Sequence, residues 1–207
     1  MIANKPGLEI RPGSMGKHIE KVVAKVLTDS GKECKMGKIG NLCLEEGWDS
    51  MFSDYLNYRR IYNKKFKEGW YYSGDKAYQD EDGYFWFIGR KDDLIKTAGH
   101  LISPFEIESA LLEIDEIVES AAIGIPDPTL HEAIVIFVRL KDDTIWEERI
   151  KLKIRIHLSN RLATFATPKE IIPLQEIPKN RSGKILRGLL KENYSPDETT
   201  DLSPAEI

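Results

Sequence analysis

The sequence predicts an α+β protein. A small β-rich subdomain with a distorted, barrel-like sheet precedes an α+β domain whose small sheet is flanked by helices. Before residue 90 the apolar runs are strand-length and separated by turn residues. After residue 93 helix-start signals alternate with longer apolar runs. We therefore expect the β-rich subdomain at 1–90, the α+β domain at 91–194 and, because the last residues are acidic and polar, a disordered tail at 195–207.

The first part of the chain is a succession of short apolar runs and turns. An Asp-Gly turn at 80–83 between aromatic runs is the strongest of these signals, because such turns favour two-residue hairpin connections. In order, the patterns predict irregular structure at 1–16, a strand at 22–27, a turn at 29–32, a strand at 42–44, a helix within 55–67 and a hairpin at 77–88.

The run Gly89-Arg90-Lys91-Asp92-Asp93 marks the expected domain boundary. It contains no apolar residue that would hold it against a core, which is typical of a solvated linker.

Two segments of the second part show the capping-box pattern, in which a hydroxyl residue precedes an acidic residue by three positions. They predict helix starts at Ser103 and Thr144. The remaining patterns predict a buried helical stripe at Ile107, Ala110, Leu111 and Ile114, strands at 117–125 and 133–140, a helix to about Leu162 with Ile150, Ile154 and Leu158 on one face, and a strand at 171–174.

Composition excludes several functional classes. The net charge is −4, which argues against a nucleic-acid partner, and no apolar run approaches the ~20 residues of a membrane span. Cys34 and Cys43 form no Cys-x-x-Cys pair and the four histidines are scattered, so no metal site is predicted. Two free thiols favour a reducing, cytoplasmic location.

Lys184 lies in the polar loop Pro178-Lys179-Asn180-Arg181-Ser182-Gly183-Lys184-Ile185. An ammonium on a flexible stem suits a phosphate or a carboxylate, and the glycine predicts a mobile loop. The loop is not a phosphate-binding Walker motif, because it lacks the first glycine and the magnesium-binding hydroxyl. By itself it is also compatible with a solvated surface loop.

Four further residues are candidates on chemical grounds. Asp75 could accept hydrogen bonds from both hydroxyls of a ribose, and Arg90 could contact ribose or phosphate. The alternatives are a turn aspartate and a surface ion pair. Asp92, with its neighbour, is either a cation-binding pair or a solvated linker. Gly99 marks either a close approach of ligand to backbone or an ordinary hairpin.

Four motifs occur in one order along the chain. They are Tyr72-Ser73-Gly74-Asp75, Gly89-Arg90-Lys91-Asp92-Asp93-Leu94-Ile95-Lys96-x-x-Gly99, Glu106-Ile107-Glu108, and Pro178-Lys179-x-Arg181-Ser182-Gly183-Lys184-Ile185-x-Arg187. Together they resemble the C-terminal part of the adenylate-forming superfamily, which includes acyl-CoA synthetases, peptide-synthetase adenylation domains and luciferases. Segments 12–16 and 47–52 look most like medium-chain acyl-CoA synthetases.

The resemblance implies a role for each candidate. Asp75 would bind the AMP ribose and Arg90 would assist at ribose or phosphate. Asp92 would be the hinge of a mobile C-terminal lid domain, and Gly99 would line the passage for CoA. Lys184 would be catalytic, bridging the acyl carboxylate and the phosphate. The implied cofactors are ATP or AMP, CoA and magnesium, with the magnesium ligands in the family's upstream domain.

The activity implied is AMP-forming ligation of an acid to a thiol, through an acyl-adenylate that is transferred to CoA. The family's phosphate loop and its nucleotide- and acyl-binding domain are not in this sequence. We therefore expect little ligase activity from the chain alone. The expected partners are the missing N-terminal adenylation domain or a split subunit, and a small carboxylic acid.

Three residues depart from the family pattern. Leu101 stands where an arginine associated with CoA is frequent, Asn41 where glutamate is usual and His131 where glycine is usual. Leu101 leaves open an acyl-AMP ligase or a peptide-synthetase-type adenylation module. A non-catalytic module that binds a partner synthetase or carrier protein is the remaining alternative.

Overall fold

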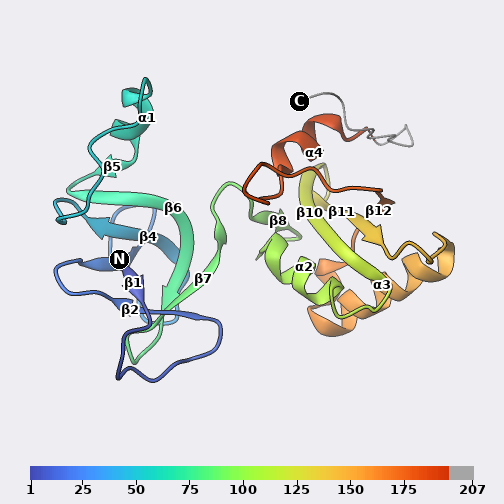
Figure 1. The fold of residues 1–207 in the computed structure, drawn as a ribbon, viewed down its shortest axis with the longest axis horizontal. Coiled ribbons are helices and arrows are strands. Elements are labelled where there is room, and N and C mark those ends of the chain that lie inside the picture. The colour runs from blue at the N-terminus through green and yellow to red at the C-terminus, as the bar shows by residue number, and fades with distance from the viewer. Residues whose placement is uncertain (196–207) are drawn as a thin grey trace. The chain divides into compact units, whose positions relative to one another are not determined.

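The computed structural model describes residues 1–195, which form two compact units, Met1–Asp92 and a second that begins at Asp93 (Figure 1). Each unit has its own apolar core. Apart from Ser195, the tail predicted at 195–207 lies outside the described residues. The α+β fold predicted from the sequence is confirmed.

The first unit is an antiparallel sheet with strand order β1-β2-β7-β6-β4-β3, in which β5 also pairs with β6. The row ends at β1 and β3, so the sheet is open and does not close into a barrel. Its elements are β1 (Ile2–Ala3), β2 (Ser14–His18), β3 (Ala24–Leu27), β4 (Gly40–Glu45), α1 (Arg59–Lys64), β5 (Phe66–Lys67), β6 (Trp70–Gln79) and β7 (Phe85–Arg90).

Several predictions for this unit are corrected by strand pairing. The segment 1–16, predicted as irregular, contains β1 and the first three residues of β2. The helix predicted within 55–67 is reduced to α1, because Phe66 begins β5 and pairs with Tyr71 of β6. The Phe66 ring packs against Tyr62 and Tyr71 in tilted arrangements, at 4.7 and 5.2 Å between ring centroids. The aromatic hairpin is confirmed as β6 and β7.

The charged run at the end of this unit is not wholly a linker. Gly89 and Arg90 belong to β7, and the Lys91 N–H donates to the Gly74 carbonyl oxygen at 2.8 Å. The prediction that nothing holds this run was therefore wrong, because backbone pairing holds a strand end even where its side chains are charged.

The second unit is a mixed sheet with strand order β10-β11-β8-β9, and β12 lies parallel to β11. Its elements are β8 (Ile95–Thr97), β9 (His100–Ile102), α2 (Pro104–Leu111), β10 (Ile117–Asp127), β11 (His131–Leu140), α3 (Glu148–Arg161), a 3₁₀ turn (Thr164–Ala166), β12 (Glu170–Pro173) and α4 (Arg187–Asn193). Within the described residues no helix is both long and apolar enough to span a membrane.

Strand β11 is buried on both faces. Side chains alternate along a strand, so Ile134, Ile136 and Val138 face one layer while Val135 and Phe137 face the other. The first layer contains residues of α2 and α3, and the second contains Leu190 of α4 (Figure 1). The continuous apolar run of β11 thus fixes helices on both sides of the sheet. Helix α4 itself was not predicted, because it is short and polar.

Only one of the two predicted capping boxes forms. At Ser103 the side chain accepts the Phe105 N–H at 3.2 Å, and the Glu106 carboxylate accepts the Ser103 N–H at 3.2 Å. The box predicted at Thr144 is wrong, since α3 begins at Glu148 with Glu147 as its N-cap.

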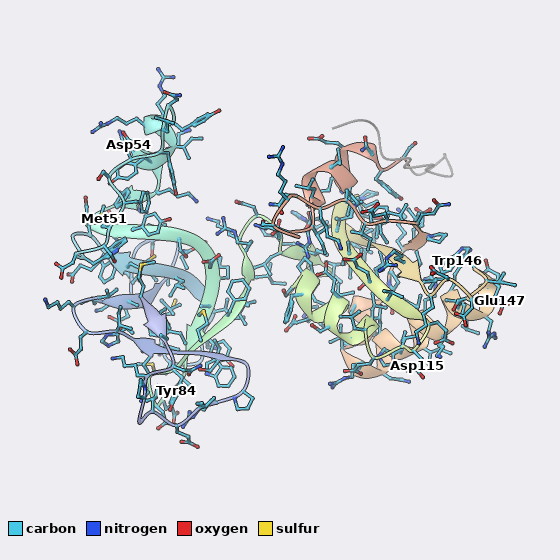
Figure 2. All side chains as sticks on the ribbon, viewed as in Figure 1. Met51, Asp54, Tyr84, Asp115, Trp146 and Glu147 are labelled. Carbon is cyan, nitrogen blue, oxygen red and sulfur yellow. The ribbon has the colours of Figure 1, made fainter. Side chains whose placement is uncertain are left out.

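The segment before α3 stays extended because Trp146 packs on the core. Trp146 is partly buried against the first layer (Figure 2). The Glu147 carboxylate accepts from Arg149 Nε at 2.9 Å and makes no cap hydrogen bond. Burial of an indole outweighs a surface cap of about 1 kcal/mol.

His131 adopts φ 73°, a left-handed conformation at the turn between β10 and β11. Glycine reaches this region without steric cost, whereas other L-residues are strained by roughly 1–2 kcal/mol. His131, which replaces the family's usual glycine, therefore stands at a position where the backbone conformation favours glycine.

We expect Ser103→Ala to destabilise the second unit by about 1 kcal/mol, because it removes one acceptor of the capping box. Amide hydrogen exchange of β11 in the full chain measures this unit separately from the first. Thr144→Ala is the matched control and should change stability by less than about 0.5 kcal/mol. Equal destabilisation by the two variants would contradict the assignment of the caps.

Asp127 should make the second unit sensitive to acid. Its carboxylate accepts the Leu130 and Thr129 N–H groups and pairs with Lys169, which lowers the pKa of Asp127 to about 2. Because the folded pKa is depressed, the stabilisation is complete above about pH 4 and is lost as pH falls toward 2. Unfolding of the wild type and of Asp127→Asn at pH 6 and pH 3 should therefore give a smaller difference at pH 3, and a constant difference would refute this.

Candidate active site

The predicted site residues are divided between the two units. Asp75, Arg90 and Asp92 belong to the first unit, and Gly99 and Lys184 belong to the second. Each group is described within its own unit.

Asp75 and Arg90 are cross-strand partners on β6 and β7. Arg90 Nη1 donates to Asp75 Oδ1 at 2.9 Å and to the Ser73 carbonyl oxygen at 3.1 Å. The pair is partly exposed, with 25% of the Asp75 side chain and 37% of the Arg90 side chain accessible. The structure therefore brings two of the predicted residues together. Asp75 Oδ2 accepts no hydrogen bond from the described residues, so it keeps its full capacity as an acceptor.

Ser73 and Gly74 hold the backbone that carries Asp75. The Ser73 hydroxyl donates to the Leu42 carbonyl oxygen at 2.9 Å and accepts the Asp75 N–H at 3.1 Å. Gly74 has φ 87°, and a Cβ there would lie 3.0 Å from Arg90 Nη2 and 3.2 Å from Lys65 Nζ. The backbone conformation requires glycine, and a Cβ would also displace the ends of these two cationic side chains by a few tenths of an ångström.

A groove of about 500 Å³ lies beside the backbone at Gly74, and neither Asp75 nor Arg90 lines it. It is lined by Asp29, Asn41, Ile61, Lys64, Lys65, Lys67, Tyr72, Gly74, Lys91 and Asp92. Lys65 beside Arg90 was missed by the sequence reasoning, because a lysine in a run of lysines carries no distinguishing signal.

Asn41 anchors one wall of the groove. Its buried amide donates to the Leu27 carbonyl oxygen at 3.2 Å and to Asp29 Oδ1 at 3.0 Å. This hydrogen bond, followed by the charge of Lys76, lowers the pKa of Asp29. Asparagine, which stands at position 41 in place of the usual glutamate, therefore satisfies two buried acceptors with its neutral amide.

Asp92 is exposed and is the last residue of the first unit. In residues 1–195 its carboxylate makes no ion pair.

Gly99 occupies the tight turn of the β8–β9 hairpin, with φ 80° and no atom within 4 Å of a potential Cβ. The backbone conformation, rather than crowding, therefore requires glycine here. Next to it, His100 stacks on Phe165 at 4.1 Å between ring centroids. Leu101 is 40% exposed and presents an apolar side chain beside the turn.

Lys184 is exposed on a short hairpin that closes on itself. The Asn180 N–H donates to the Lys184 carbonyl oxygen and the Leu186 N–H to the Pro178 carbonyl oxygen, both at 2.9 Å. Asn180 Oδ1 also accepts the Lys184 N–H at 2.9 Å. This loop is more constrained than its composition predicts. Within the described part of the chain the Lys184 ammonium has no carboxylate partner.

A buried ion pair stands directly after this loop. Arg187 Nη2 donates to Glu108 Oε1 at 2.6 Å and to Oε2 at 2.7 Å. Burial raises the pKa of Glu108, and the charge of Arg187 opposes the shift. Both residues stand in the motifs quoted above, but the sequence alone gave no signal that they are in contact.

The two thiols are free, and burial raises the pKa of Cys43 to about 12. Burial also raises the pKa of Cys34. Neither is therefore poised as a nucleophile near neutral pH.

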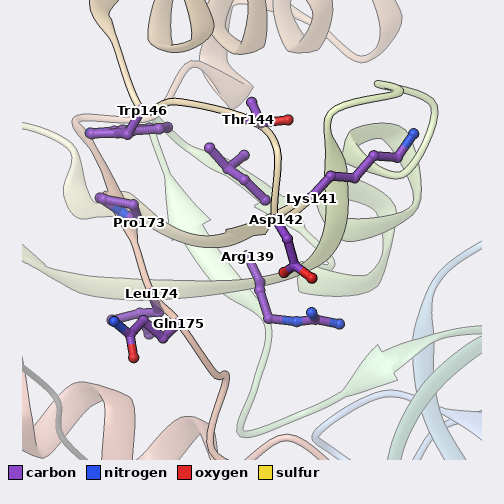
Figure 3. Close-up of a pocket in the computed structure, with 9 residues that line it drawn as sticks. Arg139, Lys141, Asp142, Thr144, Trp146, Pro173, Leu174 and Gln175 are labelled. Atoms are coloured by element: carbon purple, nitrogen blue, oxygen red, sulfur yellow. The ribbon is translucent and has the colours of Figure 1, made fainter.

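A second concave region, of about 530 Å³, lies in the second unit (Figure 3). It is lined by Arg139, Leu140, Lys141, Asp142, Thr144, Trp146, Pro173, Leu174 and Gln175. Neither Gly99 nor Lys184 lines it, so it is separate from the candidate residues.

The chain is similar to known proteins both in sequence and in fold. Residues 106–184 match the family model of the AMP-binding enzyme C-terminal domain. The chain is 44% identical over 192 residues to an acetyl-coenzyme A synthetase of Bacillus subtilis, covering 92% of this chain and 34% of that protein. It is 36% identical over 195 residues to the mitochondrial acyl-coenzyme A synthetase ACSM4 of Rattus norvegicus, with 92% and 34% covered. The chain thus spans about a third of the length of these relatives.

Solved structures show the same likeness. An anthranilate CoA ligase, AuaEII, in complex with anthranoyl-AMP superposes with a TM-score of 0.80 at 36% identity, over 92% of this chain and 36% of that one. ATP-bound MatB from Rhodopseudomonas palustris gives a TM-score of 0.80 at 30% identity, with 92% and 37% covered. The chain therefore carries an AMP-binding enzyme C-terminal domain and corresponds to the C-terminal portion of the acyl-CoA synthetases, which are adenylate-forming enzymes.

Proposed function

We propose that this chain supplies the catalytic lysine and the ribose-binding carboxylate of an AMP-forming acid–thiol ligase. The observation that carries the proposal is the environment of Lys184. Its exposed ammonium, without a carboxylate partner in residues 1–195, projects from a hydrogen-bonded hairpin at the end of the matched domain. The whole reaction requires a nucleotide- and acyl-binding domain, the proposed partner of this chain.

In the first half-reaction, an oxygen of the substrate carboxylate forms a bond to the α-phosphorus of ATP. The bond from that phosphorus to the bridging oxygen breaks, and pyrophosphate leaves with the electron pair. Two anions must meet, and charge accumulates on the phosphoryl oxygens. The Lys184 ammonium is proposed to stabilise this charge, an effect typically worth about 3 kcal/mol.

Asp75 and Arg90 are proposed to hold the nucleotide during this step. Asp75 Oδ2, which has no protein donor, can accept a hydrogen bond from a ribose hydroxyl, while the hydrogen bond from Arg90 orients the carboxylate. Magnesium would neutralise phosphate charge in such a reaction. No cluster of three His, Cys, Asp or Glu side chains among the described residues could bind it, so we assign it no residue here.

In the second half-reaction, the thiolate sulfur of CoA forms a bond to the acyl carbon, and the bond from that carbon to the phosphate oxygen breaks to release AMP. Lys184 is not needed for this step. We propose that Gly99 lines the path of the thiol. We also propose that Asp92 is the hinge about which the C-terminal domain rotates between adenylation and thioester formation. The substrate is proposed to be a small carboxylic acid.

Lys184→Ala should lower the rate of adenylation by roughly 10²–10³-fold, because it removes transition-state charge stabilisation. Thioester formation from a supplied acyl-adenylate should be unchanged. The assay requires the complete enzyme, which is either the full-length protein or this chain fused to the remainder of the Bacillus subtilis relative. Pyrophosphate release and acyl-CoA formation report the two steps.

Lys191→Ala, which removes an exposed lysine of α4, is the matched control and should leave both steps unchanged. Equal loss of both half-reactions in Lys184→Ala would contradict the assigned role.

Asp75→Asn should raise the apparent Kd for ATP by about 10–100-fold, since a hydrogen bond to a charged acceptor is worth about 1.5–3 kcal/mol. The variant should also lose discrimination between ATP and 2′-deoxy-ATP, measured by equilibrium binding to the same complete enzyme. Asp82→Asn, in the hairpin turn of the same unit, is the control. Unaltered discrimination in Asp75→Asn would rule out ribose binding by this carboxylate.

A further inference from the structure

The hairpin that carries Lys184 is held at both ends by ion pairs. On its entry side Lys179 pairs with Glu119 of β10, and on its exit side Arg187 pairs with Glu108 of α2. The exit pair is the more buried, with 15% of the Arg187 side chain and 11% of the Glu108 side chain exposed. Lys184 thus lies between two anchored positions.

Glu108 joins three elements. Its carboxylate accepts from Arg187 of α4 and also accepts the Ala122 N–H of β10 at 3.0 Å. Because β10 is the last strand of the sheet order, this N–H would otherwise be an unpaired edge donor. Through Glu108 the start of α4 is therefore fixed to α2 and to the edge of the sheet.

Arg187 depends on this one carboxylate. A single nitrogen, Nη2, donates to both Glu108 oxygens, while Nε is buried and has no acceptor in residues 1–195. A charge in this environment is stable only beside its counter-ion. The guanidinium therefore has one favourable position, and α4 begins at the residue that carries it.

The hairpin couples the position of Arg187 to the position of Lys184. Lys179 and Ile185 form a backbone bridge, and the Leu186 N–H donates to the Pro178 carbonyl oxygen at 2.9 Å. Between Arg187 and Lys184 there are only Ile185 and Leu186, both partly buried. A shift of Arg187 must therefore move the lysine.

We propose that Glu108 and Arg187 are positioning residues for Lys184, and that their ion pair sets where the catalytic ammonium is presented. This inference rests on the proposed function of Lys184. A purely structural pair would instead support the second unit as a whole and affect every activity of the enzyme alike.

The first test measures the hairpin directly in the 207-residue chain. Glu108→Gln retains an oxygen for the Ala122 N–H but removes the charge. We expect amide hydrogen exchange at Gly183 and Lys184 to accelerate at least tenfold, with the amides of β11 unchanged. Glu113→Gln, which breaks the exposed pair with Arg161 in the same unit, should leave both sets unchanged. Unchanged exchange at the hairpin in Glu108→Gln would overturn the proposal.

The second test uses the complete enzyme and separates the two half-reactions. Glu108→Gln should slow adenylation at least tenfold while thioester formation from a supplied acyl-adenylate is unchanged. The reversed pair, Glu108→Arg with Arg187→Glu, should recover part of the loss. Loosening of the hairpin with normal adenylation would overturn the proposal, and so would equal slowing of both steps.

Arg187→Lys covers the possibility that Glu108→Gln unfolds the unit, which faster exchange of β11 would reveal. It retains the charge but loses the planar geometry, and it should slow adenylation alone by a smaller factor. Normal adenylation in a folded Arg187→Lys variant would overturn the proposal. If Lys184→Ala adenylates normally, the proposed function fails, whereas the exchange result still reports whether the ion pair holds the hairpin.

Discussion

The burial of β11 on both faces is the constraint on which the second unit depends. An apolar strand of this kind must be covered twice, so helices are required on each side of the sheet. Helices α2 and α3 occupy one layer and α4 the other, and the chain must therefore pass from one layer to the other before α4. The hairpin with Lys184 lies immediately before α4, so the packing of α4 against β11 helps to determine where the lysine lies.

In the first unit the equivalent constraint is electrostatic. Arg90 at the end of β7 is cross-strand to Asp75 on β6, and Gly74 leaves room for its guanidinium. Lys65 brings a further positive charge to the same point, and no carboxylate of the described residues pairs with it. The unit thus presents an excess of cationic groups beside one open carboxylate oxygen, which suits a ligand with both phosphate and hydroxyl groups.

The sequence predicted those parts of the fold that local chemistry decides. The hairpin at 77–88, the cap at Ser103 and the buried stripe of α3 each follow from neighbouring residues, and the structure has all three. Prediction was wrong where tertiary packing overrode a local signal. Because Trp146 packs on the core, α3 begins later than the capping pattern at Thr144 predicts. Arg90 is held in a strand by pairing with β6, although its neighbours are charged.

The candidate site divides in the same way. Asp75 and Arg90 were predicted individually, and the structure adds that they are partners. Glu108 and Arg187 could not be paired from the sequence, because they stand 79 positions apart and only the fold brings them together. A long-range ion pair produces no periodic pattern in the sequence. The only sequence signal for Glu108 and Arg187 was that both stand in the ordered motifs.

The self-closed hairpin around Asn180 has a thermodynamic consequence. Its hydrogen bonds close within the hairpin itself, between Asn180 and Lys184 and between Pro178 and Leu186. A ligand that meets Lys184 therefore need not order a disordered loop, and the association loses less conformational entropy than contact with a floppy segment would. The conformational entropy lost on binding is then chiefly that of the lysine side chain.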